Sequence, residues 1–223
     1  MVSAYTQQVL EVFHLHEDPH NAKPMAKYMK NKFAYFGIKS PLRKEISKPL
    51  LGRNMIPKID DVPVVVQELW DQPQRELQYF ALELLQKYAR ASPAKWIDFY
   101  EELITQKSWW DSVDGLAAAQ VGGHFKKYPD QISTYTMAWM NSGNMWLQRT
   151  CLIFQLKYKN QTDFELMKSF IIPSAESKEF FIRKAIGWAL RQYGKFNPQD
   201  VIEFVNHQPM SNLSRREALK LLE

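Results

Sequence analysis

The sequence predicts an all-α protein built from repeated helix pairs, as in HEAT-like solenoids. Apolar residues recur at helical spacing through long stretches of Leu, Glu, Lys, Gln and Ala, and the chain has only 8 glycines in 223 residues. Runs that alternate apolar and polar residues between turns, which are typical of strands, are missing. The length suits one hydrophobic core, so we expect a single HEAT-like repeat domain that spans residues 1–223.

Prolines, glycines and short polar turns are expected to divide the chain into helices, because they interrupt the helical pattern. These breakers are Pro19, Pro24, Gly37, Ser40–Pro41, Gly52, Pro57, Asp71–Pro73, Ser92–Pro93, Pro129, Gly143, Pro173, Pro198 and Pro209. Side chains able to cap a helix N-terminus precede four of the expected helices. These N-caps are Ser108, Asn144, Ser177 and Ser211.

A repeat register emerges when five segments are aligned on a small residue that we call the anchor. The anchors are Ala81, Gly115, Cys151, Ala185 and Ala218, at successive spacings of 34, 36, 34 and 33 residues. One helix pair per step accounts for this period, and small anchors let neighbouring helices stack closely. The first 60 residues do not fit the register cleanly, and an amphipathic all-α chain can also be slid into a weak register by chance.

Composition bounds the class of protein. Seven tryptophans are many for this length; Trp70, Trp96 and Trp139 are expected to fill the core, although an aromatic surplus is also typical of a binding surface. The single cysteine, Cys151, excludes an internal disulfide, and the first residues do not resemble a secretory signal. No apolar run reaches the roughly 20 residues that a membrane span needs. We therefore expect a cytoplasmic protein.

Positive charge is concentrated in residues 19–58. This segment holds ten basic residues against one acid, Glu45, and so has a net charge of +9, which leaves −4 for the rest of the chain. The basic residues are Lys23, Lys27, Lys30, Lys32, Lys39, Arg43, Lys44, Lys48, Arg53 and Lys58. Such an excess suits a polyanionic partner. A merely solvated lysine face explains it equally well.

Within this basic segment, Ser40 and Pro41 are expected to begin a helix. Its free N–H groups would be suited to receive a phosphate, with Tyr28, Arg43 and Lys44 nearby in the sequence. The alternative role of the segment is structural, as the cap of the solenoid.

In the later repeats, aromatic and basic residues fall on one stripe of the anchor-bearing helices. Counted from the anchor, the stripe consists of positions −5, −2, −1 and +3, which are helical neighbours. Its members are Trp110, Asp114, Trp146, Arg149, Phe180, Arg183, Lys184, Trp188 and Arg216. If equivalent helices line the inner curve of the solenoid, these residues form a basic concave face. Aromatic rings interleaved with Arg and Lys are typical of nucleic-acid binding.

Asp114 is the one acid among these nine residues. Its simplest explanation is a salt bridge to Arg149. Asp111, three residues after Ser108, fits the S-x-x-D capping box and is expected to have that structural role. The five histidines form no HExxH motif or Cys/His cluster, and Cys151 lies at an apolar position. We therefore expect neither a metal nor a cofactor.

Several segments resemble the AlkD family of DNA alkylation repair glycosylases. They are SWWDSVD (108–114), WLQR (146–149), IFQLKY (153–158) and SKEFFIRKAIGWALRQY (177–193). The likeness extends from MAKYMKN (25–31) to SRREALK (214–220), almost the whole chain. It implies a HEAT-like solenoid that removes positively charged N3- and N7-alkylpurines from duplex DNA. Trp110, Asp114, Arg149 and Trp188 match the active-site set of the family without a departure.

The resemblance also implies roles for these residues. Asp114 would stabilise the charge that develops on the deoxyribose and orient the attacking water, while Trp110 and Trp188 would contact the sugar-phosphate and the cationic base. Arg149 would hold a phosphate, helped by Lys157 and Arg191. The expected partner is double-stranded DNA that carries alkylated bases, bound by a monomer. The cytoplasmic protein would then associate with the nucleoid. A catalytically silent DNA-binding repeat protein and a scaffold for acidic proteins are the alternatives.

Overall fold

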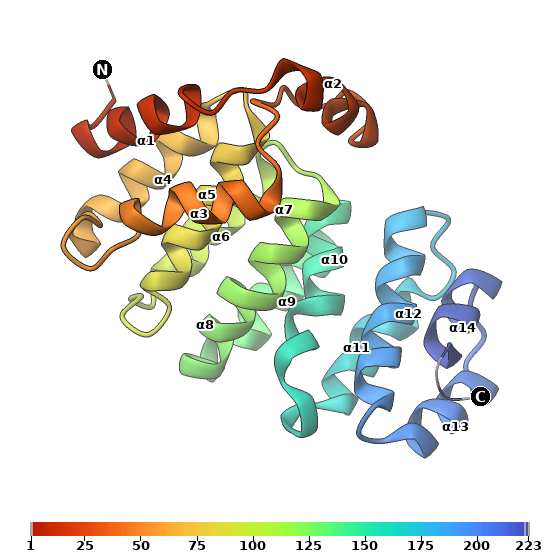
Figure 1. Ribbon diagram of the computed structural model, residues 1–223. Helices are drawn as coiled ribbons and strands as arrows, with labels where there is room; N and C mark the ends of the chain where they lie inside the picture. The colour runs from red at the N-terminus through yellow and green to blue at the C-terminus, as the bar shows by residue number, and fades with distance from the viewer. Residues whose placement is uncertain (1, 221, 223) are drawn as a thin grey trace. The chain divides into compact units, whose positions relative to one another are not determined.

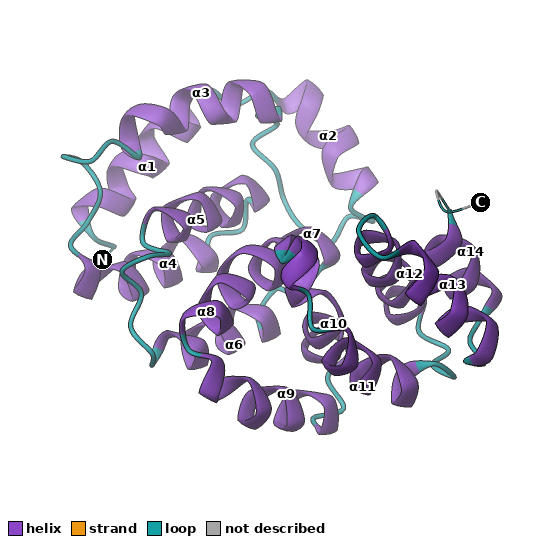
Figure 2. Ribbon diagram, turned by 90° about the horizontal axis from the view of Figure 1, so that it is seen from below, coloured by secondary structure: helices purple, strands orange, loops and turns teal. Residues whose placement is uncertain are grey.

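The computed structural model describes residues 2–220 and residue 222, and it confirms the all-α helical repeat class. In this part of the chain every regular element is a helix, and the only β-type pairing is an isolated bridge between Ala34 and Gln74 (Figure 2). The chain forms two compact units that divide between Pro93 and Ala94. The expected single domain and the basic concave face stay predictions.

The first unit consists of five α-helices and a 3-10 turn among the described residues (Figure 1). They are α1 (Ala4–His14), α2 (Pro19–Tyr28), α3 (Ser40–Leu50), η1 (Ile59–Asp61), α4 (Val62–Asp71) and α5 (Arg75–Lys87). Helix α4 packs against α5 and α1. The core includes Trp70, Phe13 and Phe80, all fully buried, and the Phe13 and Phe80 rings meet edge to face at 5.7 Å. Helix α3 begins at Ser40, as the sequence predicts.

A buried carboxylate holds the loop that leads into α3. Glu76 of α5 is fully buried and accepts hydrogen bonds from the backbone N–H groups of Phe36, Gly37 and Ile38 at 3.1, 2.9 and 3.1 Å. Burial raises the pKa of Glu76, and the three backbone donors oppose part of that rise. The loop that precedes α3 is therefore fixed from within its own unit.

The second unit continues with helix pairs. Its elements are α6 (Trp96–Thr105), α7 (Trp110–Gly115), η2 (Leu116–Val121), α8 (Gly122–Lys127), η3 (Pro129–Gln131), α9 (Ile132–Asn141), α10 (Met145–Ile153), η4 (Phe154–Lys157), η5 (Lys159–Gln161), α11 (Phe164–Ser174), α12 (Phe180–Gly194), α13 (Pro198–His207) and α14 (Asn212–Leu219). The anchors of this unit lie on α7, α10, α12 and α14. Helix α10 contacts both α7 and α12, and α12 contacts α14 (Figure 1). The anchor helices are therefore successive neighbours, as the register predicts.

Burial explains the small anchors. Cys151, Ala185 and Ala218 are 2%, 0% and 0% exposed, and they allow the helices to approach. The two tryptophans of this unit that were expected in the core, Trp96 and Trp139, are buried as well. In the described residues, no helix is both long and apolar enough to cross a bilayer.

Two of the four expected N-caps are confirmed and two are wrong. Asn144 and Ser211 accept hydrogen bonds from the first turns of α10 and α14. Ser108 instead donates to the Ile104 carbonyl at the end of α6, so α7 begins after Trp109 and the capping box with Asp111 does not form. Ser177 accepts from the Glu179 backbone in the turn before α12.

Two of the expected breakers do not separate helices. Pro24 lies within α2 and Pro173 within α11. A proline removes one backbone donor from a helix. Helix α11 has by then buried Phe170 and Ile171, and this packing holds its last turn in place.

Residues 110–127 form one helical run with a wide turn in its middle. Helix α7 passes into the π-helical residues 116–121 and then into α8. Where α8 begins, Gly122 lies against the 3-10 turn η4, and an added Cβ would come within 2.3 Å of the Phe154 carbonyl oxygen. Gly123, the next residue, has no such neighbour within 4 Å.

This pair of glycines predicts opposite effects of the same substitution. Gly122→Ala is expected to destabilise the protein by about 1–3 kcal/mol, because the new methyl group must push backbone atoms apart. Gly123→Ala is expected to stabilise it by up to about 1 kcal/mol, because alanine favours the helix. Chemical denaturation of both variants beside the wild type measures this difference. Equal effects of the two substitutions would contradict the close approach of α8 and η4.

Candidate active site

A cavity of about 360 Å³ opens in the second unit among the anchor-bearing helices α7, α10, α12 and α14. Aromatic and charged side chains line it together. The lining residues are Trp110, Asp114, Arg149, Phe180, Phe181, Lys184, Trp188, Arg191 and Glu217. The four residues that the sequence predicts for the active site therefore meet around one cavity.

Asp114 and Arg149 form a bidentate ion pair at this cavity. Arg149 donates from Nε to Oδ1 of Asp114 at 2.7 Å and from Nη2 to Oδ2 at 2.8 Å. Its third nitrogen, Nη1, donates to the backbone carbonyl of Phe181 on α12. Arg149 is only 4% exposed. A planar guanidinium held at three nitrogens has no freedom to turn, so the Asp114 carboxylate is fixed as well.

The electrostatics of Asp114 are a balance of opposing effects. Burial raises the pKa of its carboxyl above the ordinary value, and the hydrogen bonds and charge of Arg149 oppose part of that rise. Asp111 adds a smaller repulsion that also raises the pKa. The site therefore holds a carboxylate in a poorly hydrated position, where its field is strong.

A second ionic group lies on α12 and α14. Glu217 accepts from Lys184 Nζ through Oε1 at 2.9 Å and from Arg191 Nη1 through Oε2 at 2.8 Å. These hydrogen bonds lower the pKa of Glu217 to about 2. The cavity thus contains two carboxylates whose surroundings shift their pKa values in opposite directions.

An aromatic cluster lies at the N-terminal ends of α7, α10 and α12. The ring centroids of Trp109 and Phe181 are 5.0 Å apart, and those of Trp146 and Phe181 are 5.1 Å apart. Trp109 and Trp146 meet each other at 5.8 Å. The cluster holds Phe181, whose backbone carbonyl accepts a hydrogen bond from Arg149, and so supports the ion pair.

Several predicted binding residues lie away from the cavity. Trp146 belongs to the aromatic cluster, Arg183 donates to the Lys178 carbonyl, and Lys157 is exposed in η4. Arg216 is exposed on α14. The stripe is thus narrower than predicted. Arg183 and Arg216 both stand at position −2, which lies about 100° around the helix from position −1. Arg149 reaches the cavity from position −2 with its long side chain.

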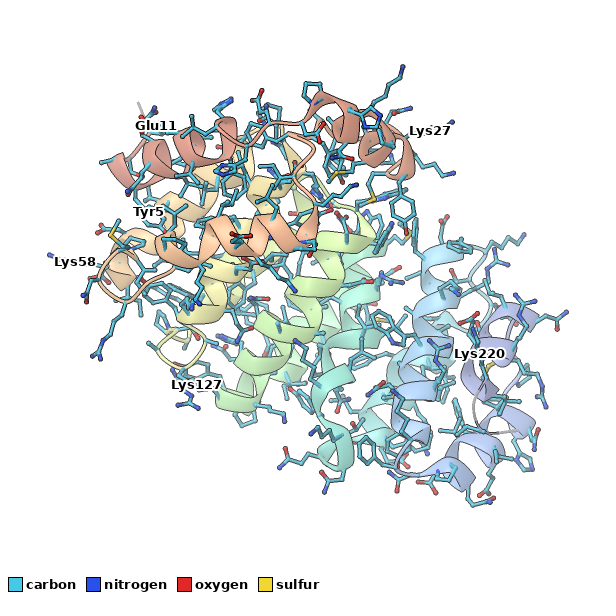
Figure 3. All side chains as sticks on the ribbon, in the orientation of Figure 1. Tyr5, Glu11, Lys27, Lys58, Lys127 and Lys220 are labelled. Atoms are coloured by element: carbon cyan, nitrogen blue, oxygen red, sulfur yellow. The ribbon has the colours of Figure 1, made fainter. Side chains whose placement is uncertain are left out.

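The predicted residues of the first unit differ in exposure. Tyr28 is 72% exposed, and Ser40 and Lys44 are exposed on α3. Arg43 is 9% exposed and pairs with Glu83 at 2.8 Å, so its charge is neutralised within the unit. Figure 3 shows other members of the basic segment, such as Lys27 and Lys58, projecting away from the ribbon.

Phe181 and Glu217 were not among the predicted site residues. Glu217 is at position −1 of the last repeat, the position of Asp114 and Lys184 in earlier repeats, so applying that position to every repeat identifies it. Phe181 contributes a backbone carbonyl as well as a ring, and no side-chain pattern reveals such a contact.

Among the described residues, no cluster of three or more His, Cys, Asp or Glu is placed to hold a metal ion. No curated protein matches the chain. The profile of a family described as DNA alkylation repair enzyme matches residues 9–222. A solved structure of a predicted DNA alkylation repair enzyme from Enterococcus faecalis is 33% identical in sequence and superposes with a TM-score of 0.85 over 92% of this chain and 95% of that one. The chain therefore belongs to the DNA alkylation repair enzyme family.

Proposed function

We propose that this protein is a DNA glycosylase that excises positively charged N3- and N7-alkylated purines from duplex DNA. The observation that carries the proposal is the Asp114 carboxylate, held in both oxygens by Arg149 at the edge of an aromatic cavity. A fixed negative charge in a poorly hydrated site is suited to stabilise a developing positive charge. Glycosidic bond cleavage produces such a charge on the deoxyribose.

The lining of the cavity favours a leaving base that is already cationic. Among the described lining residues the carboxylates are Asp114 and Glu217. Glu217 has a pKa of about 2 and stays ionised near neutral pH, so it cannot protonate a leaving base. Asp114 accepts hydrogen bonds from the Arg149 guanidinium at both oxygens, which favours its ionised form. A purine alkylated at N3 or N7 leaves as a neutral molecule and needs no general acid. The indole faces of Trp110 and Trp188 attract such a cation by about 0.5–2 kcal/mol each.

The reaction then proceeds at C1′ of the damaged nucleotide. The C1′–N9 bond breaks with its electron pair passing to N9, which neutralises the purine. Asp114 stabilises the resulting oxocarbenium-like sugar and orients the water that forms the new C1′–O bond. The proton of that water passes to Asp114 or to solvent, and the products are a free base and an abasic site.

In this proposal cations beside the cavity hold the DNA backbone, and each unit offers further candidate residues of its own. Lys184 and Arg191 line the cavity, and Lys157, Arg183 and the exposed residues Tyr28, Ser40 and Lys44 remain candidates for contacts to the backbone. A phosphate contact by Arg149 also remains a prediction. Three of its nitrogens are engaged by Asp114 and Phe181, which favours a role in positioning Asp114.

Removing the charge of Asp114 tests the mechanism. Wild-type protein is expected to release base from duplex DNA that contains N7-methylguanine or N3-methyladenine. Asp114→Asn is expected to lower the single-turnover rate by on the order of 10²-fold or more, because the preorganised charge is lost. Asp130→Asn, the same substitution at an exposed position of η3, is the matched control and should keep the wild-type rate. Absence of released base with the wild type would refute the proposed function, and full activity of a folded Asp114→Asn variant would refute the mechanism.

The pH dependence of excision tests the pairing with Arg149. Asp114 must be ionised, so the rate is lost as the pH falls through its pKa, which burial holds above the ordinary aspartate value. Arg149→Gln removes the group that lowers this pKa and is expected to move the acid limb to higher pH. Single-turnover rates across pH, corrected for uncatalysed loss of base, measure the shift. An acid limb that stays in place or moves to lower pH would show that Arg149 does not control the ionisation of Asp114.

A further inference from the structure

Glu217 occupies a position that simple charge attraction does not explain. It is an acid at the edge of a cavity that is proposed to face DNA, and its negative charge cancels part of the charge of Lys184 and Arg191. Electrostatic affinity for DNA grows with the number of phosphates that cations neutralise. An acid retained at this place therefore calls for a function that outweighs the lost attraction.

The packing of α14 on α12 places Glu217 between the two cations. Lys184, Gly187 and Arg191 lie on one face of α12, because they are three and four residues apart in succession. Gly187 provides the space for Glu217, since a Cβ there would come within 2.4 Å of the Glu217 Cβ and 2.8 Å of the Ser214 carbonyl oxygen. Helix packing thus fixes the base of the Glu217 side chain, with one cation on either side.

The contacts leave donors of both cations available. Arg191 uses Nη1 alone, for the Glu217 carboxylate at 2.8 Å and the Glu217 backbone carbonyl at 2.9 Å, which leaves Nε and Nη2 for a ligand. Lys184 Nζ donates one hydrogen bond to Glu217, and the Lys184 side chain is 37% exposed. Arg149, in contrast, has all three nitrogens engaged within the protein. Of the two arginines at the cavity, Arg191 is the one equipped for a further anion.

We propose that Glu217 is a positioning residue that holds Lys184 and Arg191 as a preformed clamp for the backbone phosphates beside the damaged base. This inference rests on the proposed function. Lysine and arginine side chains lose much rotamer freedom when they bind a ligand, and a group that orders them beforehand reduces that loss. Glu217 stays ionised throughout the range of an excision assay because its pKa is about 2, so the clamp is present at every working pH.

Two variants of equal net charge distinguish the loss of ordered cations from the loss of a negative charge. Glu217→Gln removes one negative charge and keeps the size of the side chain. Glu203→Gln makes the same change at an exposed position of α13, in the same unit but away from the cavity. Both variants change the net charge by the same amount. Glu217 lies at the cavity, so attraction alone would make Glu217→Gln bind DNA at least as tightly as Glu203→Gln. Weaker binding by Glu217→Gln therefore reports the loss of positioning. Circular dichroism and thermal unfolding verify that both are folded.

The assay is single-turnover excision of N7-methylguanine from a duplex over a series of protein concentrations. Glu217→Gln is expected to need on the order of tenfold more protein than Glu203→Gln for its half-maximal rate, because the clamp is no longer ordered. The maximal rate at saturation should stay near that of Glu203→Gln, since Asp114 and Arg149 are untouched. Equal half-maximal concentrations for the two variants, or tighter binding by Glu217→Gln, would overturn the inference.

The same proteins distinguish failure of the inference from failure of the proposed function. If the wild type releases no base, the proposed function fails, and the binding of fluorescently labelled undamaged duplex then decides the role of Glu217. Glu217→Gln is expected to bind that duplex more weakly than Glu203→Gln. Equal affinities would refute the clamp.

Discussion

The ion pair between Asp114 and Arg149 is the interaction on which the candidate site depends. A carboxylate beside an aromatic cavity pays a large desolvation cost, and a bidentate guanidinium is the partner that best offsets it. Arg149 is itself held by the Phe181 carbonyl, and Phe181 by the rings of Trp109 and Trp146. Three successive helix pairs thus converge on one charge. Loss of Arg149, or of the contacts that hold it, would leave the Asp114 carboxylate partly buried without its partner.

The small anchors make this convergence geometrically feasible. A hydrogen bond from α10 to Asp114 on α7 and another to the α12 backbone require the three helices to lie close together. Buried Cys151 and Ala185 allow that approach, and Gly187 allows the still closer approach of α14. The residues that provide space are therefore as much a part of the site as the residues that line it. None of the three lines the cavity, so their contribution shows only in the contacts that their neighbours make.

Much of this arrangement could be predicted from the sequence, because periodicity reports which face of a helix a residue occupies. The all-α class and the helix-pair period follow from side-chain spacing. Spacing also placed Trp110, Asp114, Arg149 and Trp188 on one stripe with other residues, and the family resemblance singled out these four. The wrong N-cap predictions arose because the residue type at a helix start does not report how the side chain packs. Serine is a common N-cap residue, yet the Ser108 hydroxyl donates to the Ile104 carbonyl at the end of α6. Sequence spacing does not show whether such a hydroxyl will bond to the helix before it or to the helix after it.

Side-chain length and backbone groups account for the rest. Arg149 and Arg183 share position −2, but one reaches the cavity and the other bonds to the Lys178 carbonyl. Whether an arginine at this position reaches the cavity or bonds to a nearby carbonyl depends on the neighbouring helix and not on its position in the repeat. The role of the Phe181 carbonyl is invisible to any side-chain pattern, and the ionic partners of Glu217 depend on how closely α14 approaches α12.

The wide turn at residues 116–121 has a consequence for how this protein can change over evolution. A π-helical turn accommodates one more residue than an α-helical turn, so it behaves as an insertion absorbed within a helix. Upstream of it α7 presents Asp114 to the cavity, and downstream α8 buries Phe125 against Trp139. Deletion of a single residue there would rotate one half of the helix relative to the other by about 100°. The length of this one helix is therefore constrained by the need to serve the cavity and the core at once.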